Sequence, residues 1–348
     1  MVSVLSDADR GLAGLAELGR RFPDPHLMAR PFIRQEAVLS SKIEGTRTTL
    51  DELYSFEATQ STRPASGSDA LEVENYVRAL DFGIERLNTL PVSLRLIREL
   101  HEHLFHDVRG EHLTPGEFRR SQNWVGPPGS TLETATYVPP PVEEMHLALN
   151  HLERFIHAGS DLPPLIRLGL IHYQFEAIHP FLDGNGRIGR LLISLLLCEW
   201  QLLTRPFLYL SAHFESSRPE YYARLLAVSE MNDWAGWLAY FLVGVAHRSR
   251  EAMLRIDRLM IIRDRYRQLL QKERAAERLL RVVDFLIGQP IVTVRQVQHG
   301  IQASDFKVAQ RYVDKLLDKR VLREVSGRAR NRLYRADEIM LAIQEPLD

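Results

Sequence analysis

The sequence His179-Pro-Phe-Leu-Asp-Gly-Asn-Gly-Arg-Ile-Gly-Arg190 decides the fold, because a short glycine-containing loop within it joins two helical patterns. Apolar residues recur at three- and four-residue spacing before the loop, over 165–178, and after it, over 187–203. Glycines adopt positive φ readily, so successive backbone N–H groups of this loop can point at one spot, at the positive end of the second helix. The pattern therefore predicts a helix-loop-helix that binds an anion, and a polyphosphate fits best.

Four charged or titratable side chains of this segment suit phosphate chemistry. Arg187 and Arg190 share one face near the start of the second helix, where cations are unfavourable unless an anion compensates them. Asp183 offers a hard oxygen ligand of the kind that holds Mg²⁺ beside phosphates. His179 is expected at the rim as a general base, because an unperturbed pKa of about 6.5 suits neutral pH.

Two other motifs are rejected as functional signals. Gly184-Asn-Gly-Arg-Ile-Gly189 matches the dinucleotide-binding pattern G-x-G-x-x-G, but that pattern works only after a β-strand, and here a helical pattern precedes it. His101-Glu-His-Leu-Phe-His106 resembles a zinc-protease helix, yet Phe105 stands where the second histidine ligand is needed. We interpret this second motif as a polar helix face.

The helix-loop-helix segment resembles the signature of the Fic family, H-x-F-x-D/E-G-N-G-R-x-x-R, at every specified position. The resemblance extends from about Arg30 to Val245. It implies a mainly α fold, a Fic-type helical core with a β-hairpin flap. It also implies an enzyme that transfers AMP from ATP to a Tyr, Thr or Ser hydroxyl of a target protein or of the chain itself, with release of pyrophosphate.

The resemblance implies a role for each residue of the segment. His179 takes the proton of the attacking hydroxyl, and Asp183 holds Mg²⁺ across the α- and β-phosphates. Tyr221 and Tyr222, in a following helix, are similar to the residues that lie beside the nucleotide in the family, although two adjacent tyrosines on a helix are also common in ordinary packing. The implied ATP-binding residues are Gly184, Asn185, Gly186, Arg187, Ile188, Gly189, Arg190, Tyr221 and Tyr222.

A flap is predicted between 119 and 141, where turn formers separate two short β-prone runs. By the resemblance, the flap pairs with the backbone of the target as an added strand, which orients the target hydroxyl without reading much sequence. The residues expected at this docking edge are Val125, Gly126, Thr136 and Tyr137.

The segment Ser40-Ser-Lys-Ile-Glu-Gly45 fits the autoinhibitory pattern of the same family, S/T-x-x-x-E-G/N. Ser40 and Glu44 lie one helical turn apart on one face, and Gly45 suits the end of a helix. By the resemblance, Glu44 pairs with Arg190 and occupies the cation that the γ-phosphate of ATP needs. Because the motif precedes the catalytic segment, the chain resembles the subgroup with its inhibitory helix at the N-terminus.

The composition, 348 residues with 45% hydrophobic and 26% charged side chains, is that of an ordinary globular protein of about two domains. Cys198 lies in an apolar run and is interpreted as a buried residue, not a nucleophile. The first ten residues carry charges where a signal peptide needs an apolar stretch, and no run reaches the ~18 apolar residues of a membrane span. We expect a cytoplasmic protein without membrane contact.

Three parts are predicted along the chain: an N-terminal helical region with the inhibitory helix over 1–90, the catalytic core over 91–248, and a linker helix with a winged helix-turn-helix domain over 249–348. Between Ser304 and Arg335, ten Lys and Arg residues stand against four Asp and Glu residues. Residues 304–335 are therefore a candidate DNA contact, with a protein contact or a solvated face as alternatives.

The function predicted is a Mg²⁺-dependent protein adenylyltransferase held inactive by its own N-terminal helix. Two alternatives stay open: a Fic-fold enzyme that uses another nucleotide or removes AMP, and a nucleotide-sensing DNA-binding regulator. The target protein and the donor nucleotide cannot be read from the sequence. The apolar helical segment over 234–245 offers a surface for a homodimer.

Overall fold

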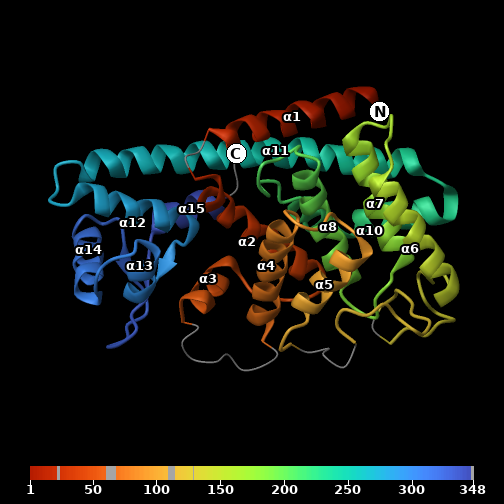
Figure 1. The fold of residues 1–348 in the computed structure, drawn as a ribbon, viewed down its shortest axis with the longest axis horizontal. Coiled ribbons are helices and arrows are strands. Elements are labelled where there is room, and N and C mark those ends of the chain that lie inside the picture. The colour runs from red at the N-terminus through yellow and green to blue at the C-terminus, as the bar shows by residue number, and fades with distance from the viewer. Residues whose placement is uncertain (22–23, 60–67, 109–113, 128, 346–348) are drawn as a thin grey trace.

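The structure, a computed structural model, describes residues 1–21, 24–59, 68–108, 114–127 and 129–345, and most of them are helical (Figure 1). The predicted mainly α fold is confirmed. The elements are α1 (Val2–Arg20), α2 (Pro25–Ile43), α3 (Leu50–Thr59), α4 (Asp69–Arg86), α5 (Leu94–Leu104), α6 (Val142–His157), α7 (Pro164–Ile178), α8 (Asn185–Glu199), α9 (Ser211–Ser216), α10 (Arg218–Met231), α11 (Trp234–Leu270), α12 (Ala276–Gly288), β1 (Ile291–Val292), α13 (Val294–Gly300), α14 (Phe306–Asp318), β2 (Arg323–Glu324), β3 (Tyr334–Arg335) and α15 (Asp337–Gln344).

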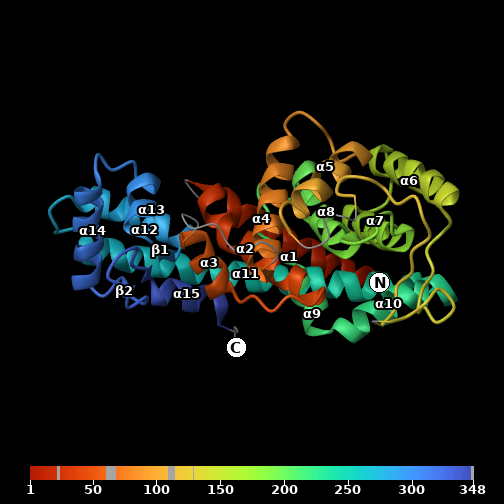
Figure 2. The same ribbon diagram turned by 90° about the horizontal axis from the view of Figure 1, so that it is seen from below.

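The long helix α11 runs along one side of the molecule, and α1 lies against it (Figures 1 and 2). A Cβ atom at Gly11 of α1 would lie 3.2 Å from Ser249 Cβ and 3.3 Å from the carbonyl oxygen of Ala246, so a larger residue there would require the two helices to shift by a few tenths of an ångström. The predicted division at residues 248–249 falls inside α11, which is continuous there.

Helix α8 forms the centre of the predicted catalytic core. Its apolar residues between Leu191 and Leu197 are all buried, because α2, α4, α5 and α7 each contact this helix. Since α8 begins at Asn185, its amino-terminal end lies directly after the glycine-containing loop, as the sequence predicts. Within the described residues, none of the helices has the length and apolar character needed to cross a membrane. The cytoplasmic location stays a prediction.

In the C-terminal part, β1 lies between α12 and α13, and β2 and β3 follow α14; the three strands form an antiparallel sheet with the order β1-β3-β2. Each strand is only two residues long. This part packs on the N-terminal region through α12, which contacts α2. A buried polar link accompanies that contact, in which Arg34 Nε of α2 donates to Glu57 of α3 at 3.0 Å and Gln289 Nε2 donates to the same carboxylate at 3.2 Å. The winged-helix assignment stays a prediction.

The flap contains less β-structure than the sequence predicts. Among the described residues, a single antiparallel bridge between Val125 and Tyr137 joins its two sides, whereas the sequence predicts a hairpin of two paired strands.

The segment over 234–245 packs mostly inside the chain. Trp237, Phe241 and Val245 are fully buried, and Val243 is the large apolar side chain that the segment exposes. This burial leaves little of the segment for the predicted homodimer, which stays a prediction.

Candidate active site

His179 ends helix α7 in the left-handed conformation, with φ 50° and ψ 60°, which non-glycine residues adopt infrequently. Two side chains hold its carbonyl oxygen in this position: Arg119 Nε donates to it at 3.1 Å and Asn123 Nδ2 at 3.2 Å. Both side chains are buried and both belong to the segment that leads into the flap. Sequence reasoning missed them, because nothing in their spacing links them to a residue some sixty positions later.

The His179 ring is oriented for proton transfer. Its Nδ1 lies 3.2 Å from the carbonyl oxygen of Glu176, which can only accept, so Nδ1 carries the hydrogen and Nε2 has a free lone pair. Burial lowers the pKa of His179 to about 4, so the ring is neutral at neutral pH. The predicted base thus has the protonation state that its role requires.

Asn185 shapes the loop with its side chain. Its Oδ1 accepts a hydrogen bond from the N–H of Phe181 at 2.8 Å, and its Nδ2 donates to the carbonyl oxygen of the same residue at 2.8 Å. Gly184 precedes it with φ 80°, and a Cβ atom there would lie 2.6 Å from the Phe105 ring. Both polar atoms of the Asn185 side chain are therefore used within the loop. If Asn185 contributes to the predicted ATP site, it does so through its backbone at the start of α8.

His101 does not lie on a polar helix face, contrary to the sequence interpretation. It is buried, its Nε2 donates to the carbonyl oxygen of Asp183 at 3.0 Å, and its Nδ1 accepts from the N–H of Gly116 at 2.9 Å. Its ring stacks on Phe181 with centroids 3.8 Å apart. Burial lowers the pKa of His101 to about 4. The imidazole therefore supports the loop in its neutral form.

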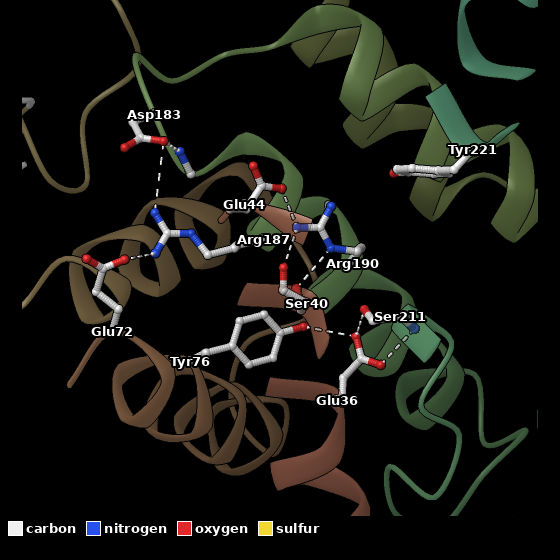
Figure 3. Close-up of polar contacts among 12 residues, drawn as sticks. Glu36, Ser40, Glu44, Glu72, Tyr76, Asp183, Arg187, Arg190, Ser211 and Tyr221 are labelled. Carbon is white, nitrogen blue, oxygen red and sulfur yellow. Dashed lines mark hydrogen bonds and ion pairs between the residues drawn. The ribbon is translucent and has the colours of Figure 1, made fainter. Parts of the chain in front are cut away.

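Arg187 and Asp183 lie at the mouth of the loop (Figure 3). Arg187 NH1 is 3.4 Å from the Glu72 carboxylate and its NH2 is 3.9 Å from Asp183 Oδ1, while the guanidinium lies over the Phe105 ring. Asp183 Oδ1 accepts from the N–H of Gly184 at 2.6 Å, and half of its side chain is exposed. The Asp183 carboxylate is thus available to a ligand, whereas Arg187 is buried beneath it.

The predicted pair between Glu44 and Arg190 is formed (Figure 3). Arg190 NH2 donates to Glu44 Oε1, Arg190 Nε donates to Ser40 Oγ at 2.9 Å, and NH2 also donates to the carbonyl oxygen of Ser40 at 3.1 Å. Burial acts to raise the pKa of Glu44, but Arg190 outweighs it and the pKa is lowered. Gly186 lies close by, since a Cβ atom there would come 2.4 Å from Glu44 Oε1.

A cavity of about 680 Å³ opens above these residues, a size typical of small-molecule sites. Most of the residues predicted for the site line this cavity. They are Glu44, Val125, Gly126, Thr136, Tyr137, His179, Asp183, Gly186, Arg190 and Tyr222.

Tyr221 and Ile188, both predicted to bind ATP, lie in the core instead. Tyr221 is 1% exposed, and its hydroxyl lies 2.9 Å from His172 Nε2. His172 Nδ1 lies 3.1 Å from the carbonyl oxygen of Gly189, which can only accept, so Nδ1 carries the ring hydrogen. Nε2 is then the acceptor, and the Tyr221 hydroxyl is the donor. Ile188 is fully buried. Tyr222 is the exposed member of the tyrosine pair and lines the cavity, whereas Tyr221 packs in the core.

Glu176 is a lining residue that sequence reasoning missed. Burial raises the pKa of its carboxyl to about 7, and its Oε1 is buried without a hydrogen-bond partner among the described residues. A Cβ atom at Gly189 would lie 2.3 Å from this oxygen. Gly189, predicted to bind ATP, therefore provides space for Glu176.

The flap covers one side of the cavity. The N–H of Val125 donates to the carbonyl oxygen of Tyr137 at 2.9 Å, and the Tyr137 hydroxyl donates to the carbonyl oxygen of Ala177 in α7 at 2.9 Å. Apolar side chains of the flap face solvent: Trp124, Leu132 and Val138.

Comparison with protein families gives two matches. The family described as "Fic/DOC family N-terminal" matches residues 2–85, and the "Fic/DOC family" matches residues 91–197. Curated relatives include proteins named "Protein adenylyltransferase Fic" from Drosophila yakuba, 32% identical, and Drosophila melanogaster, 31% identical, each over 162 residues. These matches cover 44% of this chain but only 30% of each relative, so the chain spans less than a third of the relatives' length.

Solved structures show a similar fold. A Fic family protein from Desulfovibrio desulfuricans G20 has a TM-score of 0.60 at 18% identity, covering 96% of this chain and 95% of that one. A Fic domain containing signaling protein from Bacteroides thetaiotaomicron has a TM-score of 0.54 at 19% identity, covering 71% of this chain and 97% of that one. The first of these similarities includes the C-terminal part.

Proposed function

The chain belongs to the Fic/DOC family, and on this premise we propose that it is a protein adenylyltransferase that transfers AMP from ATP to a Tyr, Thr or Ser hydroxyl of a target protein or of itself. One observation carries the proposal: the neutral His179 and the Arg190 guanidinium line the same cavity, which begins at the amino-terminal end of α8. That arrangement suits a base beside a bound polyphosphate.

In the proposed step, the target hydroxyl oxygen forms a bond to the α-phosphorus of ATP while the bond from that phosphorus to the β-bridging oxygen breaks. The proton of the hydroxyl passes to Nε2 of His179, and pyrophosphate leaves. The Arg119 and Asn123 hydrogen bonds to the His179 carbonyl fix where the ring stands. Phosphoryl chemistry depends mainly on such positioning and on charge neutralisation.

The backbone at the start of α8 and Arg190 would hold the phosphates. Arg187, bound to Glu72, would support Asp183 from below. The described residues include no group of three or more His, Cys, Asp or Glu that could hold a metal ion. A single half-exposed carboxylate fits Mg²⁺, which takes its other ligands from phosphates and water. Bound there by Asp183, Mg²⁺ would neutralise charge on the phosphates.

Autoinhibition follows from the Glu44 pair. While Glu44 and Ser40 occupy Arg190, this cation cannot receive a γ-phosphate, and ATP is not held for in-line attack. The flap would dock the target backbone beside His179, and its exposed apolar residues would widen that contact.

The first experiment compares Glu44→Gly with the wild type, each incubated with labelled ATP, Mg²⁺ and a cell lysate. We expect the variant to raise incorporation of label, because Arg190 becomes available to ATP. Equal incorporation by the two proteins would remove the inhibition claim. Mass spectrometry of the labelled band identifies the target residue and shows whether the group added is AMP or comes from another donor nucleotide.

A second candidate function, DNA binding, is favoured by a groove of about 960 Å³ between the C-terminal part and the end of α3, where Glu57 also lines it. Of the ten basic residues in 304–335, four form ion pairs within the chain: Lys315 and Lys319 with Glu273, and Arg323 and Arg335 with Asp337. The other six have no ion pair within the described residues. Three of those six, Arg328, Arg330 and Arg332, line the groove.

We expect duplex DNA to bind with an affinity that falls as salt rises, and the double replacement of Arg328 and Arg330 by Ala to weaken it and flatten the salt dependence. The matched control is the double replacement of Lys315 and Lys319 by Ala, which removes the same charge from residues already paired with Glu273. Equal binding by the two double variants would exclude the groove as the DNA site.

A further inference from the structure

Helix α2 carries a buried carboxyl group one helical turn before Ser40 and two turns before Glu44. Glu36, Ser40 and Glu44 follow one another at four-residue spacing, so they share one face of the helix. Glu36 is 3% exposed and Ser40 is fully buried. Figure 3 shows the three side chains along the same side of α2, with Arg190 opposite Ser40 and Glu44.

The Glu36 carboxylate is held by neutral donors from two other elements. The N–H of Ser211, the first residue of α9, donates to Oε2 at 3.0 Å, and the Ser211 hydroxyl donates to Oε1. The Tyr76 hydroxyl of α4 donates to Oε1 at 3.3 Å. Within the described part of the chain Glu36 forms no ion pair, so these three hydrogen bonds are the ones that satisfy the buried carboxyl group.

This arrangement makes the position of α2 specific. A buried carboxyl group that loses its donors costs free energy, and moving a helix by one residue shifts its side chains by about 1.5 Å along the axis. Glu36 therefore favours one register of α2 against α4 and α9. In that register Ser40 and Glu44 reach Arg190.

We propose that Glu36 is a positioning residue for the autoinhibition, which anchors α2 to Ser211 and Tyr76 and so keeps Ser40 and Glu44 on Arg190. The inference rests on the proposed function and deepens its regulation: the inhibitory element is a three-residue polar face, one helical turn longer than the family pattern. Loosening the anchor releases Arg190 and raises AMP transfer.

The test measures AMP transfer by Glu36→Ala, Glu36→Gln, Glu44→Gly and the double variant Glu36→Ala with Glu44→Gly. We expect Glu36→Ala to raise transfer by roughly 5-fold or more. The Gln variant keeps an acceptor of the same length and should stay near wild type. The double variant should match Glu44→Gly, because Glu36 acts through Glu44.

The control is Glu199→Ala, which removes a partly buried carboxylate that likewise accepts a backbone N–H, that of Val92, at the far end of α8. It should leave transfer near the wild-type level. Hydrogen exchange of residues 36–44 supplies a readout that does not depend on activity, and it should be faster in Glu36→Ala than in the wild type or in the control.

Failure of the anchor and failure of the proposed function give different results. If Glu44→Gly raises transfer and Glu36→Ala leaves it unchanged or lowers it, the anchor is wrong. If no variant transfers AMP, the proposed function is wrong, and the hydrogen exchange result alone then decides for or against the anchor. If Glu36→Ala does not fold, Ser211→Ala and Tyr76→Phe test the same contacts from the partner side, with a smaller rise expected for each.

Discussion

At the scale of single residues, the site depends on histidines that are kept neutral. Burial lowers the pKa of His101 and His179 to about 4 and that of His172 to about 3. Each ring uses one N–H as a donor to a backbone carbonyl and leaves the other nitrogen as an acceptor, or free in the case of His179. Neutrality thus lets His101 and His172 pack in the core, and it is the state that the role proposed for His179 requires.

This neutrality predicts a dependence of stability on pH. Between about pH 6.5 and pH 3, His172 binds a proton in the unfolded chain but not in the folded one, so its contribution to the unfolding free energy falls as the pH falls through that range. We expect the unfolding free energy of His172→Gln to depend less steeply on pH between 6.5 and 4 than that of the wild type.

Urea unfolding at a series of pH values measures this difference. The comparison with the variant is necessary because the raised pKa of Glu176, about 7, acts in the opposite direction: the folded state holds that proton where the unfolded chain has lost it. Parallel pH curves for the two proteins would show that His172 is protonated in the folded state.

At the scale of elements, the helices could be predicted closely and the flap could not. The pattern of apolar residues places α7 and α8 within a few positions of their observed ends, because each buries a face on its neighbours. The β-prone runs between 119 and 141 form a single bridge, and their position depends on Arg119, Asn123 and the Tyr137 hydroxyl, which bond to distant residues. Local propensity does not contain such long-range contacts.

The flap predicts an effect on target docking. Tyr137→Phe removes the hydrogen bond to the Ala177 carbonyl and loosens the flap from α7, while His179 and the loop before α8 stay in place. In the Glu44→Gly background, we expect the KM for the target to rise severalfold with a smaller change in kcat, as measured by AMP transfer at varied target concentration. An equal fall in kcat with unchanged KM would mean that the hydroxyl takes part in the chemical step.

At the scale of the whole molecule, α2 connects the parts. It places Glu44 in the candidate active site, contacts α12 of the C-terminal part, and bonds to Glu57 of α3 through Arg34. The Fic-type motifs predicted the Glu44 pair, since both partners belong to a known pattern. Glu36, Glu176 and His101 could not be predicted, because a buried titratable residue has no local signature and its partners come from elements far along the chain.

The most direct measurement of the central claim uses ATP labelled at either the α- or the γ-phosphate, with the Glu44→Gly protein and with the same protein carrying His179→Ala. The account predicts that label is retained on protein from the α-phosphate alone, and that His179→Ala abolishes retention while ATP still binds. Retention of the γ-phosphate label, or undiminished transfer without the His179 ring, would contradict it.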